Sequence, residues 1–271
     1  MMNHFKLGFK QAIESIKRNK ILFSVLIFLQ FLFLIIFILN LVGYHLKILD
    51  SAQIIVDAME SADYSLETMG DNEMFIQEIS GLLASYQELE KDVINLLLTS
   101  LGIFLLFNGT IWLGTHYLVH KENIKHIIKK AIKLVYSFII ITSSYSLIIY
   151  FVLIPRAMFE YKDVVPLIRD ILLISAPFYY LLLISFTSLD ISWKVFFKKM
   201  YHNGIKKAPY ALSIILLTFL LLSGLFYISY NFLEERSSIF LILALILFPI
   251  ILVISRIVLL CTLNKHENHN N

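Results

Sequence analysis

The stretch KRNKILFSVLIFLQFLFLIIFILNLV, residues 17–42, decides the fold class of this chain. Three of its first four residues are basic, and residues 21–42 contain no charged side chain. A helix of about 20 apolar residues crosses the ~30 Å hydrocarbon core of a bilayer. The run is longer than the apolar part of a secretory signal peptide, and no small-residue cleavage site follows it, so we expect it to remain as a membrane anchor.

The same pattern recurs along the chain. Hydrophobic residues make up 58% of the 271 residues, and the mean hydropathy is +0.77, well above the ~45–50% apolar content of soluble domains. We therefore predict an all-α integral membrane protein with six transmembrane helices as three helical hairpins. The predicted spans are residues 21–42, 93–119, 134–154, 171–189, 208–232 and 237–260. The single cysteine, Cys261, excludes an internal disulfide framework, and the net charge of +3 gives no indication of a nucleic-acid partner.

The distribution of basic residues predicts the orientation. Segments 1–20, 120–133 and 190–207 each contain five Lys or Arg, whereas the opposite loops, including the outer loop 155–170, contain six in all. The positive-inside rule then places both termini in the cytoplasm and the protein in the cell membrane. We expect the tail, residues 261–271, to be a disordered cytoplasmic end.

Each of the three basic segments also has a helical apolar stripe and precedes a span that runs outward. The stripes include Phe9 and Ile13 in the first segment, Ile124 and Ile128 in the second, and Phe197 in the third. Such helices lie in the headgroup plane, where anionic lipids of the inner leaflet attract their lysines. The likeness reflects either internal repetition of one unit or the common demands of this lipid surface.

Segment 43–92 has a net charge of −9, yet it carries helical apolar stripes. We predict an antiparallel helical hairpin on the outer side, with a seam that continues into the second span. The seam comprises Phe75, Ile79, Leu82, Tyr86 and Leu89. The hairpin either merely extends the spans or binds a second copy, the outer loop 155–170, an outer-surface protein or a cation. Its acids lack the spacing of a calcium loop.

Polar residues within the spans fall at two predicted levels. A neutral midplane layer comprises Gln30, Asn108, Thr110, Ser143 and Ser144, which either bond helices together or contact a substrate. Ionisable residues cluster near the cytoplasmic interface instead, namely His116, Asp190 and Arg256. They either extend independently towards water or include an Asp190–Arg256 pair. His116 and His120 share a helix face but are too few for a closed metal site.

The motifs of nucleotide binding, serine hydrolysis and zinc proteolysis are absent, and no charged residue lies at the predicted midplane. We therefore expect no cofactor and no enzymatic activity. The leading interpretation is a scaffold, sensor or accessory subunit that acts through the acidic outer hairpin.

Two other classes remain open. The six spans, the basic N-terminal helix and the outer loop after the first span resemble the membrane subunits of ABC-2 type exporters. This resemblance implies a transport permease in which segment 121–133 or 193–205 is a coupling helix for a cytoplasmic ATPase. The third class, a lipid-acting intramembrane enzyme, would use His116 and Asp190 as acid and base near the inner headgroups.

Overall fold

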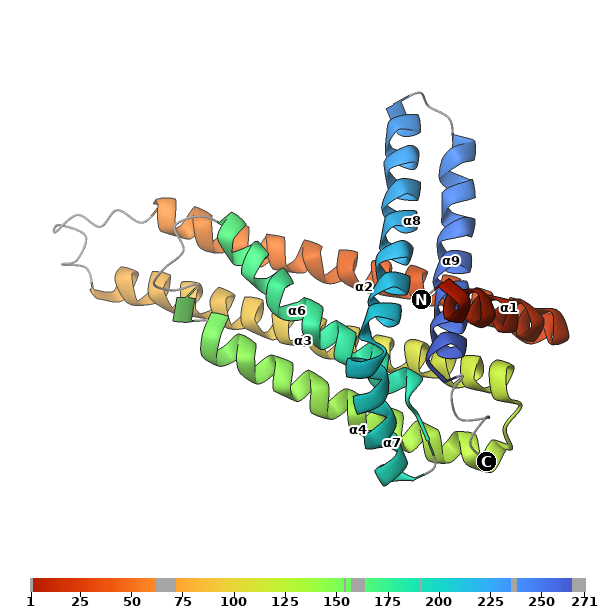
Figure 1. Ribbon diagram of the computed structural model, residues 1–271. Coiled ribbons are helices and arrows are strands. Elements are labelled where there is room, and N and C mark those ends of the chain that lie inside the picture. Colours follow the sequence, from red (N-terminus) through yellow and green to blue (C-terminus); the bar gives the residue numbers. More distant parts are fainter. Residues whose placement is uncertain are drawn as a thin grey trace. The chain divides into compact units, whose positions relative to one another are not determined.

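The computed structural model describes residues 2–61, 72–153, 155–156, 164–190, 192–234 and 238–264. For residues 2–5, 58–61, 72–80, 164, 232–234 and 238–241 it describes the backbone alone. The main elements of this part are helical (Figure 1). They are α1 (Met2–Arg18), α2 (Lys20–Ser61), α3 (Asn72–His120), α4 (Ile124–Ile148), the π-helical turn η2 (Ile149–Leu153), α6 (Val164–Thr187), α7 (Trp193–Tyr201), the π-helical turn η3 (His202–Lys206), α8 (Ala208–Glu234) and α9 (Ser238–Asn264).

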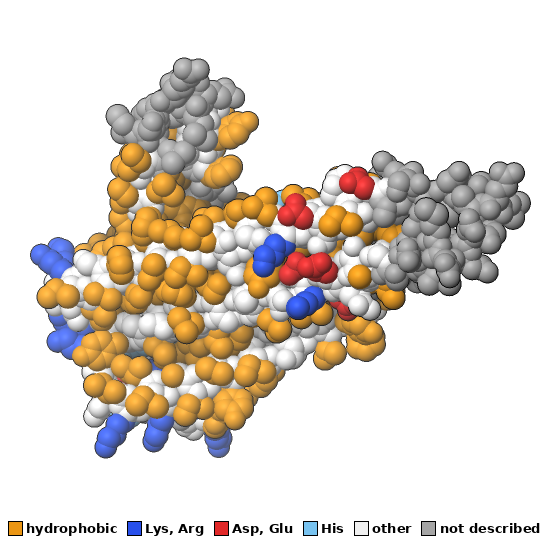
Figure 2. All heavy atoms as spheres, turned by 180° about the vertical axis from the view of Figure 1, so that it is seen from behind, with side chains coloured by type: hydrophobic (Ala, Val, Ile, Leu, Met, Phe, Trp, Pro, Cys, Tyr) orange, Lys and Arg blue, Asp and Glu red, His pale blue; other side chains and the backbone are white. Residues whose placement is uncertain are grey.

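Six of these helical segments are long and apolar enough to cross a membrane, which confirms the coarse fold prediction. They are Lys20–Asp57, Gly81–His120, Ile124–Leu153, Val165–Thr187, Ala208–Asn231 and Ile242–Asn264. Hydrophobic side chains cover most of the long helices on the face shown in Figure 2. The chain therefore has the build of a multi-pass membrane protein.

The chain divides into two compact units. The two-helix unit comprises residues 32–106, and the main unit comprises residues 1–31 with 107–271. Within the two-helix unit, α2 and α3 contact each other through an edge-to-face pair, Phe33 and Phe104, with ring centroids 6.3 Å apart. Asn40 on α2 also donates a 3.0 Å hydrogen bond to Ser100 on α3. These contacts hold the two long helices side by side (Figure 1).

The main unit contains two helix pairs, α4 with α6 and α8 with α9 (Figure 1). Tyr145 and Ser175 share a 2.8 Å hydrogen bond between α4 and α6. Thr218 bonds Ser255 between α8 and α9 at 2.9 Å. Small polar side chains that bridge apolar helices are a common means of association within membranes.

Helix α1 packs against α9 through a stripe of small residues. The sequence predicts an interfacial helix here, but it does not predict this contact with α9. Ala12 and Ser15 are buried, and a Cβ added at Gly8 would collide with the Thr262 hydroxyl oxygen. The predicted apolar residues Phe9 and Ile13 remain exposed, because small side chains let the two backbones approach more closely than phenyl rings would.

The predicted start of the tail is wrong for residues 261–264. Helix α9 continues to Asn264, and Cys261, Thr262 and Leu263 are buried. Lys207 stabilises this end, because its amino group donates to the Leu263 carbonyl, one of the terminal carbonyls without a helical partner. The rest of the predicted tail lies outside the described residues.

The predicted interfacial segment 120–133 is not separate from the span that follows. The turn is confined to residues 121–123, where Lys121 adopts φ 51° and Asn123 caps the helix. The orientation of α4 also differs from the expected one. Lys130 and Lys133 are only 5% and 3% exposed, while Ile124 and Ile128 on the predicted apolar stripe are exposed. The lysines point inward because Glu122 and the Asp190 carbonyl accept their hydrogen bonds.

Candidate functional site

The main unit holds an arginine inside one of its membrane-spanning segments. Arg256 lies in the last third of α9, and its Nη2 donates a 2.5 Å hydrogen bond to the side-chain oxygen of Asn108 on α3. Its Cζ lies 5.9 Å from the ring centroid of Trp112, one turn after Asn108 on the same helix. The other terminal nitrogen, Nη1, is buried and has no hydrogen-bond partner among the described residues. This guanidinium is therefore only partly satisfied.

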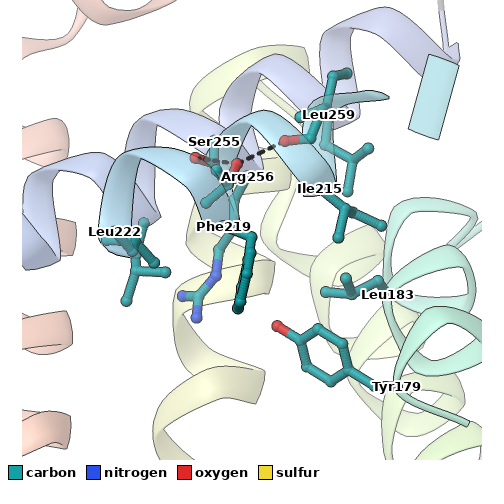
Figure 3. Close-up of a pocket in the computed structure, with 11 residues that line it drawn as sticks. Tyr179, Leu183, Ile215, Phe219, Leu222, Ser255, Arg256 and Leu259 are labelled. Atoms are coloured by element: carbon teal, nitrogen blue, oxygen red, sulfur yellow. Dashed lines mark hydrogen bonds between the residues drawn. The ribbon is translucent and has the colours of Figure 1, made fainter. Parts of the chain in front are cut away.

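A cavity of about 170 Å³ lies beside Arg256, between α6, α8 and α9. Its walls are mostly aliphatic and aromatic, and its polar groups come from Arg256, Tyr179, Thr218 and Ser255. Figure 3 shows the Arg256 guanidinium and the Tyr179 hydroxyl turned toward the same space, with the Phe219 ring beside them. An apolar pocket with a few convergent polar groups is the usual form of a small-molecule site.

The structure gives the three predicted interfacial residues different partners. Arg256 bonds Asn108, a residue that the sequence predicts at the midplane, and not Asp190, its partner in one of the two alternatives. Asp190 instead accepts a 2.7 Å ion pair from Lys199 of α7. The two side chains of that alternative thus make separate interactions, because Lys199 of α7 pairs with Asp190.

His116 is buried and serves as a link between α3 and α6. Its Nε2 lies 2.8 Å from the Phe186 carbonyl oxygen, which can only accept, so Nε2 carries the proton. The ring also lies 6.0 Å from that of His120. Within the described residues no group of three or more His, Cys, Asp or Glu side chains is arranged to hold a metal ion.

A second polar region joins the ends of the helices near α7. We call it the basal network, and it comprises Lys133, Thr187, Ser188, Asp190, Lys199, Asn203 and Asn264. Lys133 donates to the Asp190 carbonyl at 2.6 Å and lies over the Trp193 ring at 5.2 Å. Asn264 donates a 3.1 Å hydrogen bond to the Thr187 carbonyl at the end of α6. Asn203 contacts both Asn264 and Ser188. The bond to Thr187 satisfies a carbonyl that α6 leaves unpaired at its C-terminus, and the other bonds join neighbouring segments, so the network has a structural role.

The predicted midplane residues do not form one layer. Asn108 is buried against Arg256, and Gln30 is fully buried with neither amide atom bonded to a described residue. Thr110 and Ser143 are exposed. Ser144 is also exposed and bonds the Ile140 carbonyl of its own helix at 2.8 Å. Two of the five, Gln30 and Asn108, are thus buried, and the other three are exposed.

The predicted outer seam is described in part. The side chains of Phe75 and Ile79 lie outside the described residues. Leu82 and Leu89 are partly buried, whereas Tyr86 is exposed. On α2 the least exposed side chains of this segment recur with heptad-like spacing, at Tyr44, Ile48, Ser51, Ala52 and Ile55.

Four residues of this region carry no distinct signal in the sequence, namely Trp112 beside Arg256 and the cavity residues Tyr179, Thr218 and Ser255. A weak signal existed for Trp112, which lies four residues after Asn108 and therefore on the same helix face. Tyr179, Thr218 and Ser255 look like ordinary residues of apolar helices. Their convergence depends on which helices pack together.

No protein family matches this chain, and no curated protein and no solved structure is similar to it. What the chain does must therefore be inferred from its own side chains.

Proposed function

We propose that this chain is a non-enzymatic membrane protein that acts through assembly, as a scaffold, sensor or accessory subunit, and that residues 43–92 bind its partner. In this proposal the segment is an antiparallel helical hairpin on the outer side, and both chain termini are cytoplasmic.

The length of the two helices supports this proposal. Helix α2 has 42 residues and α3 has 49, which correspond to about 63 Å and about 74 Å. A hydrocarbon core of ~30 Å accommodates only about 20 residues of each. A large part of both helices must therefore lie in the headgroup region or in water.

The observation that carries the proposal is the apolar exposure of this extension, described for residues 43–57 and 81–92. Large apolar side chains are exposed on both helices, namely Leu46, Leu49, Ile54, Val56, Leu83 and Tyr86. Acidic side chains lie beside exposed apolar ones in this region (Figure 2). A mixed apolar and acidic surface that extends beyond the bilayer is typical of a protein-binding site.

Charge favours a basic partner over a second copy. Two copies of a segment with net charge −9 would repel each other, whereas a basic apolar surface would gain both electrostatic attraction and buried area. We therefore propose an outer-surface protein with a basic, partly apolar face.

Two short amphipathic helices would hold the other side of the protein against anionic lipids. Leu7, Phe9 and Ile13 on α1 are exposed beside Lys6 and Lys10. Helix α7 likewise exposes Trp193 and Phe197 beside two lysines. Apolar side chains flanked by lysines are suited to the headgroup region of an inner leaflet.

A transport permease is the second candidate, and the accessibility of α7 favours it. Lys194 and Lys198 are exposed on a helix at the end of the membrane-spanning segments, where a cytoplasmic ATPase would dock.

Crosslinking mass spectrometry of the tagged full chain, purified in a gentle detergent with an amine-reactive reagent, separates the two candidates. We expect a stoichiometric partner joined at Lys47 or Lys91. The crosslink should be lost when the crosslinked lysine is replaced by arginine, which keeps the charge but not the reactive amine. A cytoplasmic ATPase joined at Lys129 or Lys198 would overturn the assembly proposal and establish the permease. Lys199 is a poor reporter, because it is paired with Asp190.

A further inference from the structure

We propose that the cavity beside Arg256 binds the anionic headgroup of an acyl-chain amphiphile that enters from the bilayer. The headgroup is a carboxylate or a phosphate, and the acyl chain lies along α8. This inference is independent of the assembly role proposed for residues 43–92.

The first argument is the unmet charge of Arg256. Within the described residues no carboxylate pairs with its guanidinium, which bonds only the neutral amide of Asn108 and the face of Trp112. A charged side chain in a membrane-spanning segment is costly unless an opposite charge or several hydrogen bonds compensate for it. Since Nη1 is still free to donate, an anion in the cavity would receive a charge-assisted hydrogen bond.

The second argument is the chemistry of the cavity walls. Leu183, Ile214 and Leu259 form a buried apolar lining on α6, α8 and α9, while the Tyr179 hydroxyl is turned toward the same space as the guanidinium (Figure 3). A cavity of about 150 Å³ holds a molecule as large as benzene. The ~170 Å³ present here therefore has room for a carboxylate or phosphate with the first carbons of its chain.

The third argument is the entrance. Tyr179 is 52% exposed and Phe219 is 65% exposed, so the rim of the cavity reaches the surface that faces lipid. Leu222 continues the lining by one turn of α8, and Phe226 beyond it is exposed. Phe219, Leu222 and Phe226 share one face of α8 and offer an apolar path for an acyl chain.

A purely structural role for Arg256 is the alternative. In that case Arg256 would only link α9 to α3 through its hydrogen bond to Asn108, and bilayer lipid of any kind would fill the cavity. The two interpretations differ in one respect, since only a binding site discriminates an anionic headgroup from a neutral one of the same shape.

The test uses the full chain in phosphatidylcholine nanodiscs with cis-parinaric acid, a fluorescent fatty acid, and its methyl ester as the neutral control. The chain has two tryptophans, so Trp193→Phe leaves Trp112, next to Arg256, as the sole energy donor. We expect saturable quenching of Trp112 by the acid, and only the linear background of lipid-dissolved probe with the ester.

Arg256→Gln should weaken binding of the acid at least about tenfold, because a charge-assisted hydrogen bond is lost. Arg256→Lys should retain part of the affinity. Arg169→Gln, which changes an exposed arginine of the same unit, should leave it unchanged. Ser255→Leu fills the cavity but keeps the guanidinium, and it provides a second test if Arg256→Gln fails to fold.

Equal quenching by acid and ester, or unchanged affinity in both Arg256→Gln and Ser255→Leu, would overturn the proposal. Competition identifies the source of the headgroup. Displacement of the probe by phosphatidate supports a phosphate, and displacement by oleate alone supports a fatty-acid carboxylate.

Discussion

Arg256 on α9 donates its hydrogen bond to Asn108 on α3, so a cation in a membrane-spanning segment is stabilised by a neutral amide and, among the described residues, not by a carboxylate. Removal of the acceptor should leave a buried donor unsatisfied. We expect Asn108→Leu to destabilise the protein by about 1.5–3 kcal/mol, the usual contribution of a hydrogen bond to a charged group. Thermal unfolding in detergent would measure this loss. Ser144→Ala, at an exposed serine bonded within its own helix, is the matched control.

The Arg256–Asn108 pair also predicts a substitution that raises the thermal stability of the protein. Asn108→Asp would place a carboxylate beside the guanidinium and should raise the melting temperature above that of the wild type, since the partly buried cation then has a counter-ion. A melting temperature of Asn108→Asp below that of Asn108→Leu would show that Arg256 already has an anionic partner.

Close approach of α1 and α9 depends on Gly8. A Cβ there would collide with the Thr262 hydroxyl oxygen and lie 3.1 Å from the Thr262 Cα, and the backbone atom cannot rotate away. We expect Gly8→Ala to cost about 1–3 kcal/mol, as overpacked sites do. The matched control is Gly224→Ala in α8, where nothing lies within 4 Å of the new methyl group. That change should stabilise its helix by about 0.5–1 kcal/mol. Unfolding midpoints that move in the same direction would contradict this account of the packing.

The inward lysines of α4 predict a difference in chemical reactivity. Lys130 and Lys133 are buried and hydrogen-bonded, whereas Lys125 and Lys129 on the same helix are exposed. An amine-reactive reagent should therefore label Lys125 and Lys129 faster, as mass spectrometry of the folded protein would show. Equal labelling of all four would mean that the helix turns its basic face to the solvent, as its sequence alone predicts.

The Asp190–Lys199 ion pair lies in a partly exposed part of the basal network, with side chains 26% and 17% exposed. A double-mutant cycle with Asp190→Asn and Lys199→Met should give a coupling energy of about 0.5–1 kcal/mol, reduced because solvent screens the pair. The coupling should fall further in high salt. A coupling that does not depend on salt would indicate that the pair is fully shielded from water.

The sequence predicts the six spans because hydropathy is a local property that a run such as residues 21–42 carries by itself. It does not predict which face of a helix meets which neighbour. Residues 124–135 show the difference, since the apolar residues Ile124 and Ile128 are exposed, and Lys133 bonds a carbonyl supplied by the distant residue Asp190. Arg256 and Asn108 were each noticed as polar residues, but their contact depends on the packing of α9 against α3.

Gln30 provides a test of whether a buried amide of the main unit has a hydrogen-bond partner beyond the described residues. Its side chain is 0% exposed, and neither its amide nitrogen nor its oxygen bonds any described residue. A buried amide without partners costs about 1–3 kcal/mol in proteins, so Gln30→Leu, which removes the polar atoms at nearly constant volume, should stabilise the purified protein by a similar amount. The matched control is the reverse change, Leu26→Gln, one helical turn earlier on the same buried face, which should destabilise the protein. A lower unfolding midpoint for Gln30→Leu would mean that this amide is hydrogen-bonded in the purified protein, because the lost free energy must then come from a hydrogen bond that no described residue supplies.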